Sequence, residues 1–408
     1  MQVRLFIMMA LQLGIWGAWA PKLFPYMASL GFSPSQQALV GSCWGISGLI
    51  AIFFSNQFAD RRFAAERFLS VSHAISALCL LGVAWSTSFS AFFGFYLLYS
   101  IVYVPTISVT NAIAFANLQN PVADFGKVRM GGTVGWVLAS WPFVFILSAD
   151  AQPGEVRSIF IVAAVVSFAL AAYALTLPNT PPRKDAREPF AWRKTFDLLR
   201  RPVFAVLFFV TFVDSVIHQG YYVLADPFLT DRVGIAGNLS MVVLSIGQVA
   251  EIVAMLVLGY FLARLGWKVT MVVGVLGHAA RFLVFSYFAD SVPAIIAVQL
   301  LHGICYAFFF AALYIFVDHY CGKDIRTSAQ GLFNLLILGV GNVVASIIFP
   351  QLTAYYSVDG IVDYQALFLV PAGMSLFAAA VLVMFFRPEA LAARKETTEI
   401  ENERATEA

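Results

Sequence analysis

The sequence predicts an all-α membrane protein with twelve transmembrane helices arranged as two six-helix halves. Of its 408 residues, 60% are hydrophobic and only 12% are charged, whereas soluble domains carry about 25% charged residues. The apolar residues gather in runs long enough to cross a bilayer, so the lipid bilayer is the expected surrounding. The formal net charge is only +2, and no nucleic-acid partner is expected.

Runs of about 20 apolar residues, separated by polar or Pro/Gly-rich breaks, predict the individual helices, because a helix needs about 20 residues to cross the hydrocarbon core. The first run is expected to be retained rather than cleaved as a signal peptide, since Pro21 opposes cleavage after Ala20 and similar runs follow. The predicted spans are residues 4–29, 37–59, 67–87, 90–117, 129–149, 156–178, 203–229, 239–262, 267–289, 291–317, 326–354 and 364–386.

The longest break, residues 179–202, is rich in Arg and Lys and separates the two halves. The predicted organisation is an N-terminal half at 1–178, this basic linker, a C-terminal half at 203–387 and a disordered tail at 388–408. Lys and Arg gather in the loops on one side of the spans, and the linker and both termini fall on that side. The positive-inside rule therefore places the linker and both termini in the cytoplasm.

Two short motifs recur at an offset of about half the chain. The loop Asn56–Phe63 corresponds to Gly259–Gly266, and Lys127–Arg129 corresponds to Lys323–Arg326. Both loops resemble the Gly-x-x-x-Asp-Arg-x-Gly loop of the major facilitator superfamily, although the first lacks both glycines and the second lacks the aspartate. Such a repeat implies two parallel halves with a binding site at their interface.

Glu251 is the first candidate for a functional side chain. It lies in the span 239–262, three residues after Gln248, so the two share a helix face. A carboxylate at membrane depth costs at least about 2.5 kcal/mol on insertion scales, and is tolerated mainly where it faces a bundle interior, a partner or water. The alternative is a structural hydrogen bond to a neighbouring helix.

Other spans carry polar residues with helical spacing. Arg129 and Thr133 lie one turn apart with Trp136 on nearly the same face, although Arg129 could instead be a loop cation at the inner surface. His302 and Tyr306 are four residues apart. The remaining polar groups are Asp214, His218, Gln219, Tyr222 and Asp226 in the span 203–229, and the pair His278 and Arg281, which we interpret mainly as an interhelical contact.

These side chains suit a small polar ligand with a flat ring and hydroxyl groups. Amides can donate and accept on a base edge, aromatic rings can stack on it, and a carboxylate can accept from sugar hydroxyls. A nucleoside fits this description, and a sugar fits it almost as well. No catalytic residues, metal site or cofactor are expected, because no nucleophile with its base stands out and the four cysteines lack metal-ligand spacing.

Seven short stretches carry a resemblance to a known family: Leu13–Trp19, Val104–Thr106, Asn117–Asn120, Arg129–Gly135, Ser245–Glu251, Ala280–Phe282 and Arg326–Gly331. With them the chain resembles, over nearly its whole length, the bacterial nucleoside:proton symporters of the major facilitator superfamily. The resemblance implies proton-driven import of nucleosides across the bacterial inner membrane, with no obligate protein partner. Uptake of another polar solute, such as a sugar or nucleobase, and a membrane receptor are the alternatives.

The resemblance also implies a set of site residues. In that family the substrate site includes an arginine, a threonine, two glutamines and a glutamate, and the glutamate is the group expected here to couple the proton. The positions that look like them are Arg129, Thr133, Gln219, Gln248 and Glu251. Where the family pattern has Phe, Asn, Tyr and Phe-Asp, this chain has Trp136, Tyr222, His302 and Tyr306-Ala307. The predicted site includes the first three of these residues and Tyr306, but not Ala307.

Overall fold

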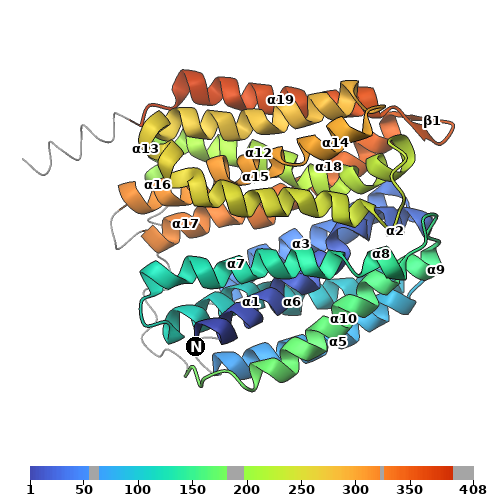
Figure 1. Cartoon of the computed structure of the whole chain (residues 1–408), viewed down its shortest axis with the longest axis horizontal. Coiled ribbons are helices and arrows are strands. Elements are labelled where there is room, and N and C mark those ends of the chain that lie inside the picture. The colour runs from blue at the N-terminus through green and yellow to red at the C-terminus, as the bar shows by residue number, and fades with distance from the viewer. Residues whose placement is uncertain (55–63, 182–196, 322–325, 389–408) are drawn as a thin grey trace, which may run out of the picture.

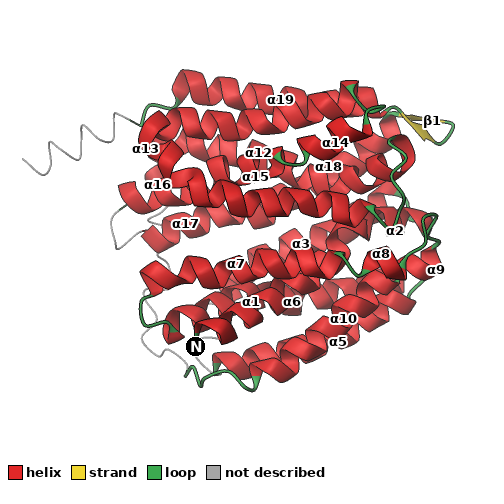
Figure 2. Ribbon diagram, viewed as in Figure 1, coloured by secondary structure: helices red, strands yellow, loops and turns green. Residues whose placement is uncertain are grey.

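The computed structural model describes residues 1–54, 64–181, 197–321 and 326–388 (Figure 1). Its long helices run side by side, and the loops turn at the two ends of the bundle. The N-terminus and the last turn of α19 lie at the same end, which we call the N-terminal end. Figure 2 shows helix almost throughout, with one short hairpin at the opposite end.

The first half of the chain forms the lower part of Figure 1. Its first helix does not run straight through, because Pro21 falls in the short 3-10 turn η1, and proline cannot donate the hydrogen bond that an α-helix interior needs. The elements are α1 (Gln2–Trp19), η1 (Ala20–Lys22), α2 (Leu23–Ser29), α3 (Pro34–Phe54), α5 (Ala65–Trp85), α6 (Phe89–Asn117), α7 (Pro121–Ser140), α8 (Phe143–Ile146), α9 (Pro153–Val156) and α10 (Ser158–Ala174).

The second half forms the upper part of Figure 1. Three of its segments, η4, η5 and η6, are wound as π-helix. The elements are η3 (Asp197–Arg200), α12 (Pro202–Pro227), η4 (Phe228–Arg232), α13 (Ser240–Tyr287), α14 (Val292–Val298), α15 (Leu301–Cys305), η5 (Tyr306–Ala311), α16 (Ala312–Tyr320), α17 (Arg326–Asn334), η6 (Leu335–Val340), α18 (Gly341–Tyr355), β1 (Ser357–Val358), β2 (Ile361–Val362) and α19 (Tyr364–Phe385).

The predicted all-α membrane fold is confirmed. Nine helices among the described residues are long and apolar enough to cross a membrane. The longest, α13, holds two crossings, because Gly266 has a φ of 70° and breaks it, a conformation that glycine adopts without a Cβ clash. At 1.5 Å per residue, α3 and α7 are about 30 Å long and complete the twelve crossings.

Each half has its own core. In the first half, α6 presents Tyr96, Tyr99 and Tyr103 at helical spacing, and all three are fully buried. Trp19 donates from Nε1 to the Tyr99 hydroxyl at 3.0 Å. Lipid tails are as apolar as these side chains, so close packing and interhelical hydrogen bonds, rather than transfer out of water, hold the helices together.

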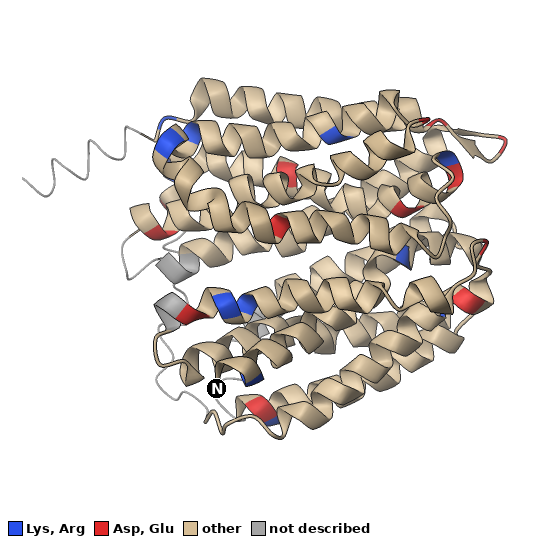
Figure 3. Cartoon of the chain, in the orientation of Figure 1, with Lys and Arg blue, Asp and Glu red and all other residues tan. Residues whose placement is uncertain are grey.

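The outer surface and the placement of charge agree with a bilayer environment. Large apolar side chains such as Leu138 and Leu256 are exposed, by 58% and 77% respectively. Figure 3 shows that most charged positions of the described residues lie toward the two ends of the bundle, with few along its middle. The few in the middle therefore need partners, because lipid cannot solvate them.

The structure also contains elements that hydropathy does not predict. The π-helical segments shift side chains around the helix axis, and such segments are frequent at functional sites. One of them, η5, begins at Tyr306, which belongs to the predicted site. A β-hairpin, β1 with β2, closes the connection between α18 and α19.

Part of the predicted repeat and organisation lies outside the described residues. This applies to the loop Asn56–Phe63, to Lys323, to residues 182–196 of the linker and to the tail from residue 389. The second copy of the loop falls within α13, where the Arg264 guanidinium lies 5.0 Å from the centre of the Tyr260 ring.

Candidate transport site

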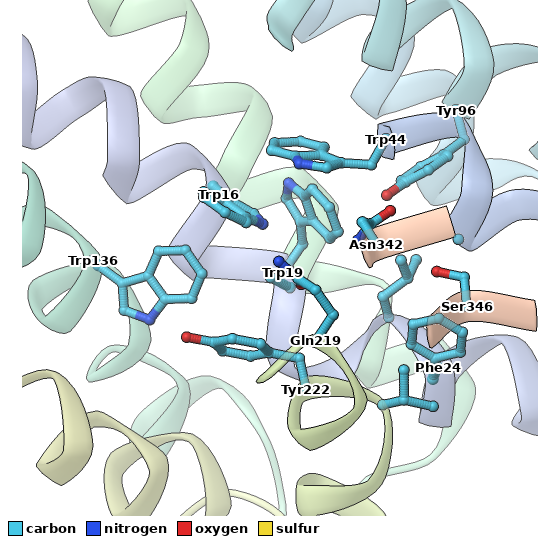
Figure 4. Close-up of a pocket in the computed structure, with 14 residues that line it drawn as sticks. Trp16, Trp19, Phe24, Trp44, Tyr96, Trp136, Gln219, Tyr222, Asn342 and Ser346 are labelled. Carbon is cyan, nitrogen blue, oxygen red and sulfur yellow. The ribbon is translucent and has the colours of Figure 1, made fainter. Parts of the chain in front are cut away.

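An aromatic pocket lies at the interface between the two halves (Figure 4). Its volume is about 40 Å³, and one water needs roughly 10–15 Å³ by this measure, so the pocket holds only a few waters. Figure 4 shows indole rings from the first half facing amide and phenol side chains from the second. The aromatic and polar lining consists of Trp16, Trp19, Phe24, Trp44, Tyr96 and Trp136 from the first half, and Gln219, Tyr222, Asn342 and Ser346 from the second.

Close packing of α1 against α7 places Trp136 in this pocket. A Cβ atom at Gly135 would lie 1.9 Å from the Ala10 carbonyl oxygen, and one at Gly17 would lie 2.8 Å from Trp136 Cα, so both positions require glycine. Trp16 then meets the Trp136 ring edge-on, with 4.9 Å between ring centres. The backbones of the two helices thus fix the aromatic wall.

Tyr222, which lines the pocket from the second half, belongs to a cluster of three polar side chains from three helices. The Gln248 amide of α13 lies 3.1 Å from the Tyr222 hydroxyl of α12 and 3.1 Å from His302 Nε2 of α15. The Tyr222 hydroxyl is 3.4 Å from the same ring nitrogen. Across the interface, the Tyr222 ring centre is 6.0 Å from that of Trp136. The structure therefore brings together four of the predicted site residues.

Two amide side chains line the pocket from the second half. Gln219 lines it from α12, and its Nε2 lies 3.5 Å from the Ile337 carbonyl oxygen of η6. Asn342 of α18 accepts a hydrogen bond from the Gly45 backbone N–H of α3 at 3.1 Å. Asn342 thus joins the two halves, and the sequence analysis did not single it out.

Arg129, Thr133, Glu251 and Tyr306 form a second part of the interface. On α7, Thr133 lies about one turn and Arg129 about two turns before the pocket residue Trp136, toward the N-terminal end. All four residues are partly exposed. The positive charge of Arg129 acts on the Glu251 carboxylate of α13 and on the Tyr306 hydroxyl of η5. A cation of the first half therefore faces the polar groups of the second.

A buried network lies behind Gln248. Arg281, which is fully buried, places Nη1 2.9 Å from His302 Nδ1 and Nη2 3.0 Å from His278 Nδ1. His278 Nε2 faces the Asp214 carboxylate at 3.8 Å. Asp214 thus supplies a carboxylate near Arg281, while Ala307, where the resemblance has aspartate, lies in the core of the second half.

A buried ion pair that the sequence analysis missed lies near the opposite end. Lys22 of η1 reaches the Asp226 carboxylate of α12 at 3.1 Å and the Ser240 hydroxyl of α13 at 3.0 Å. Lys22 is 4% exposed and Asp226 is 2% exposed. The sequence feature that could have indicated this pair is a cation and an anion within two apolar runs, at positions that fall at the same end of the bundle.

Further hydrogen bonds between the halves lie near that ion pair. The Trp141 indole donates to the Ser245 hydroxyl at 3.3 Å, and the Asn238 amide donates to the Val144 carbonyl at 3.2 Å. On the outer side of Lys22 the surface forms a hollow of about 490 Å³. The contacts between halves thus close the interface between the aromatic pocket and the opposite end.

Twelve crossings in two halves, with polar groups converging on a mid-bundle interface, define a secondary transporter of the major facilitator type. More particularly, the chain belongs to the nucleoside H+ symporter family, whose model matches residues 1–390. It is accordingly a proton-coupled nucleoside transporter and not an enzyme.

Individual relatives agree with this assignment. The putative nucleoside transporter YegT of Escherichia coli K12 is 31% identical over 401 residues, covering 94% of this chain and 93% of that protein. The xanthosine permease of the same organism is 31% identical over 404 residues, covering 94% and 96%. The crystal structure of the nucleoside transporter NupG superposes with a TM-score of 0.84 at 25% identity, over 95% of this chain and 99% of that one.

Proposed function

We propose that this symporter imports nucleosides into the bacterial cytoplasm and binds them between Trp136 of the first half and the Tyr222–Gln248–His302 cluster of the second. The observation that carries this proposal is the 6.0 Å approach of Trp136 and Tyr222 across the interface. A flat base can stack on the aromatic wall, and base–aromatic stacking contributes about 1–3 kcal/mol. Relatives named for nucleosides and for xanthosine support the same ligand class.

In this proposal different polar side chains bind the base edge and the ribose of the nucleoside. Gln219 and Gln248 bind the edge of the base, because an amide can donate and accept there. Arg129, Thr133 and Glu251 contact the ribose, because a carboxylate accepts strong hydrogen bonds from the hydroxyl groups of a sugar. The pocket of about 40 Å³ is too small for this ligand, so binding requires the pocket to widen.

Glu251 is proposed as the proton-coupling group. It lies one turn from Gln248 and within the field of Arg129. A carboxylate in such a place changes its proton affinity when water enters or leaves and when the cation moves, which is what rocking of two halves brings about. Each proton moving inward contributes roughly 2.3 kcal/mol per 100 mV of membrane potential.

The moving units in this mechanism are residues 1–178 and 203–387, joined by the linker 179–202. The protein lies in the bacterial inner membrane in this proposal, with both termini and the tail 388–408 in the cytoplasm. The end of the bundle opposite the termini then faces outward. The Lys22–Asp226 pair then closes the outer side. Opening of the outer side requires separation of this pair.

The experiment that tests the proposed function is uptake of radiolabelled uridine and adenosine by vesicles that contain the purified protein. An imposed inward proton gradient is expected to drive accumulation of at least one of them, and collapse of the gradient by an ionophore should abolish it. Failure of folded, reconstituted protein to move either nucleoside would contradict the proposal.

A further inference from the structure

The buried network behind the site determines where the protons lie on two histidines. Arg281 approaches Nδ1 of His302 at 2.9 Å and Nδ1 of His278 at 3.0 Å. A guanidinium group has only donors and stays protonated in proteins. Both Nδ1 atoms must therefore accept, and each neutral ring carries its proton on Nε2.

The second histidine provides an internal check on this assignment. Nε2 of His278 faces a carboxyl oxygen of Asp214 at 3.8 Å, so its N–H points toward an acceptor atom. The opposite placement of protons would turn the N–H of both rings toward the Arg281 guanidinium and set donor against donor. One arginine thus fixes the same tautomer in both rings.

The tautomer of His302 then decides how Gln248 is oriented. The amide nitrogen as placed lies 3.1 Å from His302 Nε2, which would bring two N–H groups face to face. Rotation of the amide by half a turn exchanges its nitrogen and oxygen, and hydrogen bonding decides between the two arrangements. With the oxygen facing His302, it accepts from the Nε2–H and from the Tyr222 hydroxyl, which lies at 3.1 Å.

We propose that His302, held by Arg281, is a positioning residue that turns the Gln248 amide so that its NH2 group faces the ligand. Both acceptor positions of the amide oxygen are then occupied inside the protein. Gln248 offers the ligand donors only, and the site selects nucleosides whose base edge carries a carbonyl oxygen over those with an amino group. This inference rests on the proposed function, in which Gln248 meets the base.

Two pairs of nucleosides test the selection, because uridine and inosine carry a ring carbonyl where cytidine and adenosine carry an amino group. Binding to the full-length protein in detergent is measured by isothermal titration. The wild type is expected to prefer the carbonyl member of a pair by about tenfold, since an unpaired buried donor is costly. In His302→Leu the amide is free to turn, and this preference should fall to near unity.

His218→Phe is the matched control. The His218 ring stacks on the His302 ring with 5.0 Å between centres. It takes no part in the hydrogen bonds that link Arg281, His302 and Gln248. The control should keep the wild-type preference. A loss of preference in both variants would indicate a packing effect and would overturn the assigned role of His302.

The tautomer can be observed directly in the wild-type protein. Solid-state 15N NMR of protein labelled at its five histidines should show the His302 proton on Nε2, with the signal assigned by its absence from His302→Leu. A proton on Nδ1 overturns the inference. Equal affinity for both members of each pair overturns it too while the proposed function stands, whereas absence of binding by all four nucleosides removes the proposed function.

Discussion

Lys22 and Asp226 form an ion pair of 3.1 Å between the two halves, although 204 residues separate them in the chain. Both are nearly inaccessible to water, so each charge depends on the other. Removing one partner of a buried pair typically costs about 3–5 kcal/mol. In an outward-open state both groups would regain water, so the pair favours closure without preventing opening.

Breaking this pair should shift the protein toward the outward-open state. In Lys22→Met the Asp226 carboxylate loses its partner, and we expect a cysteine at Ala20, which lines the aromatic pocket, to react faster with an impermeant thiol reagent added outside. The background is a variant without the four native cysteines. The double variant Lys22→Asp with Asp226→Lys, which restores an ion pair, serves as the control. Labelling that stays slow in Lys22→Met would contradict the role of the pair.

Trp136 should contribute stacking to nucleoside binding. Trp136→Ala removes the ring that faces Tyr222, and the expected loss is about 1–3 kcal/mol, which isothermal titration can measure. Trp136→Phe should retain part of the affinity. Trp85→Ala, at a ring that is 60% exposed on the outer surface, is the control for removing an indole. Equal affinities in all these variants would place the base elsewhere.

Gln219 and Gln248 should both bind the ligand from the second half. We expect either glutamine, replaced by Ala, to weaken nucleoside binding by on the order of 1–3 kcal/mol, because a desolvated ligand group loses its hydrogen-bond partner. Thermal unfolding followed in detergent checks that both variants are folded. Wild-type affinity in both would move the site away from these helices.

Glu251→Gln should separate transport from its driving force. The amide keeps the shape and some hydrogen bonding of the carboxyl group but cannot ionise, so the variant is expected to exchange nucleoside across vesicles without accumulating it in response to pH or voltage. Counterflow with labelled uridine measures exchange, and gradient-driven uptake measures coupling. If gradient-driven accumulation persists near the wild-type level, the coupling group is another residue, with Asp214, His218 and Asp226 as the next candidates.

The orientation in the membrane can be measured directly. We predict that the linker between the halves is cytoplasmic, since its Lys and Arg residues follow the positive-inside rule. A single cysteine at Lys184 should therefore react with an impermeant reagent only after permeabilisation. Ready labelling in intact cells would reverse the topology, and with it the assignment of the closed side as the outer side.

The fold was accessible from sequence because bilayer thickness imposes a length on every span. Helical spacing also anticipated neighbours on one helix, such as His278 and Arg281, which are hydrogen-bonded at 3.0 Å. The second contact of Arg281, to His302, depends on how α13 and α15 are shifted along each other. Hydropathy does not encode that shift, so the buried network was not predicted as a unit.

Contacts between the halves were harder still to predict. The sequence analysis did not single out Lys22, because only the docking of η1 against α12 and α13 places it beside Asp226 and Ser240. Trp44 carried no polar signal, yet its ring stacks on Trp16 with 4.7 Å between centres and lines the pocket. Which residues each helix turns toward the other half is a property of the assembled pair of bundles.

The indole cluster between the halves has an electrical consequence. Its pocket has room for only a few waters, and indole rings lack the alternating donors and acceptors along which a proton hops. This path therefore offers little room for a file of water that could conduct protons across the interface. The tryptophans therefore insulate the membrane voltage at the point where the carrier must open, and a variant with smaller rings there should leak protons without cargo.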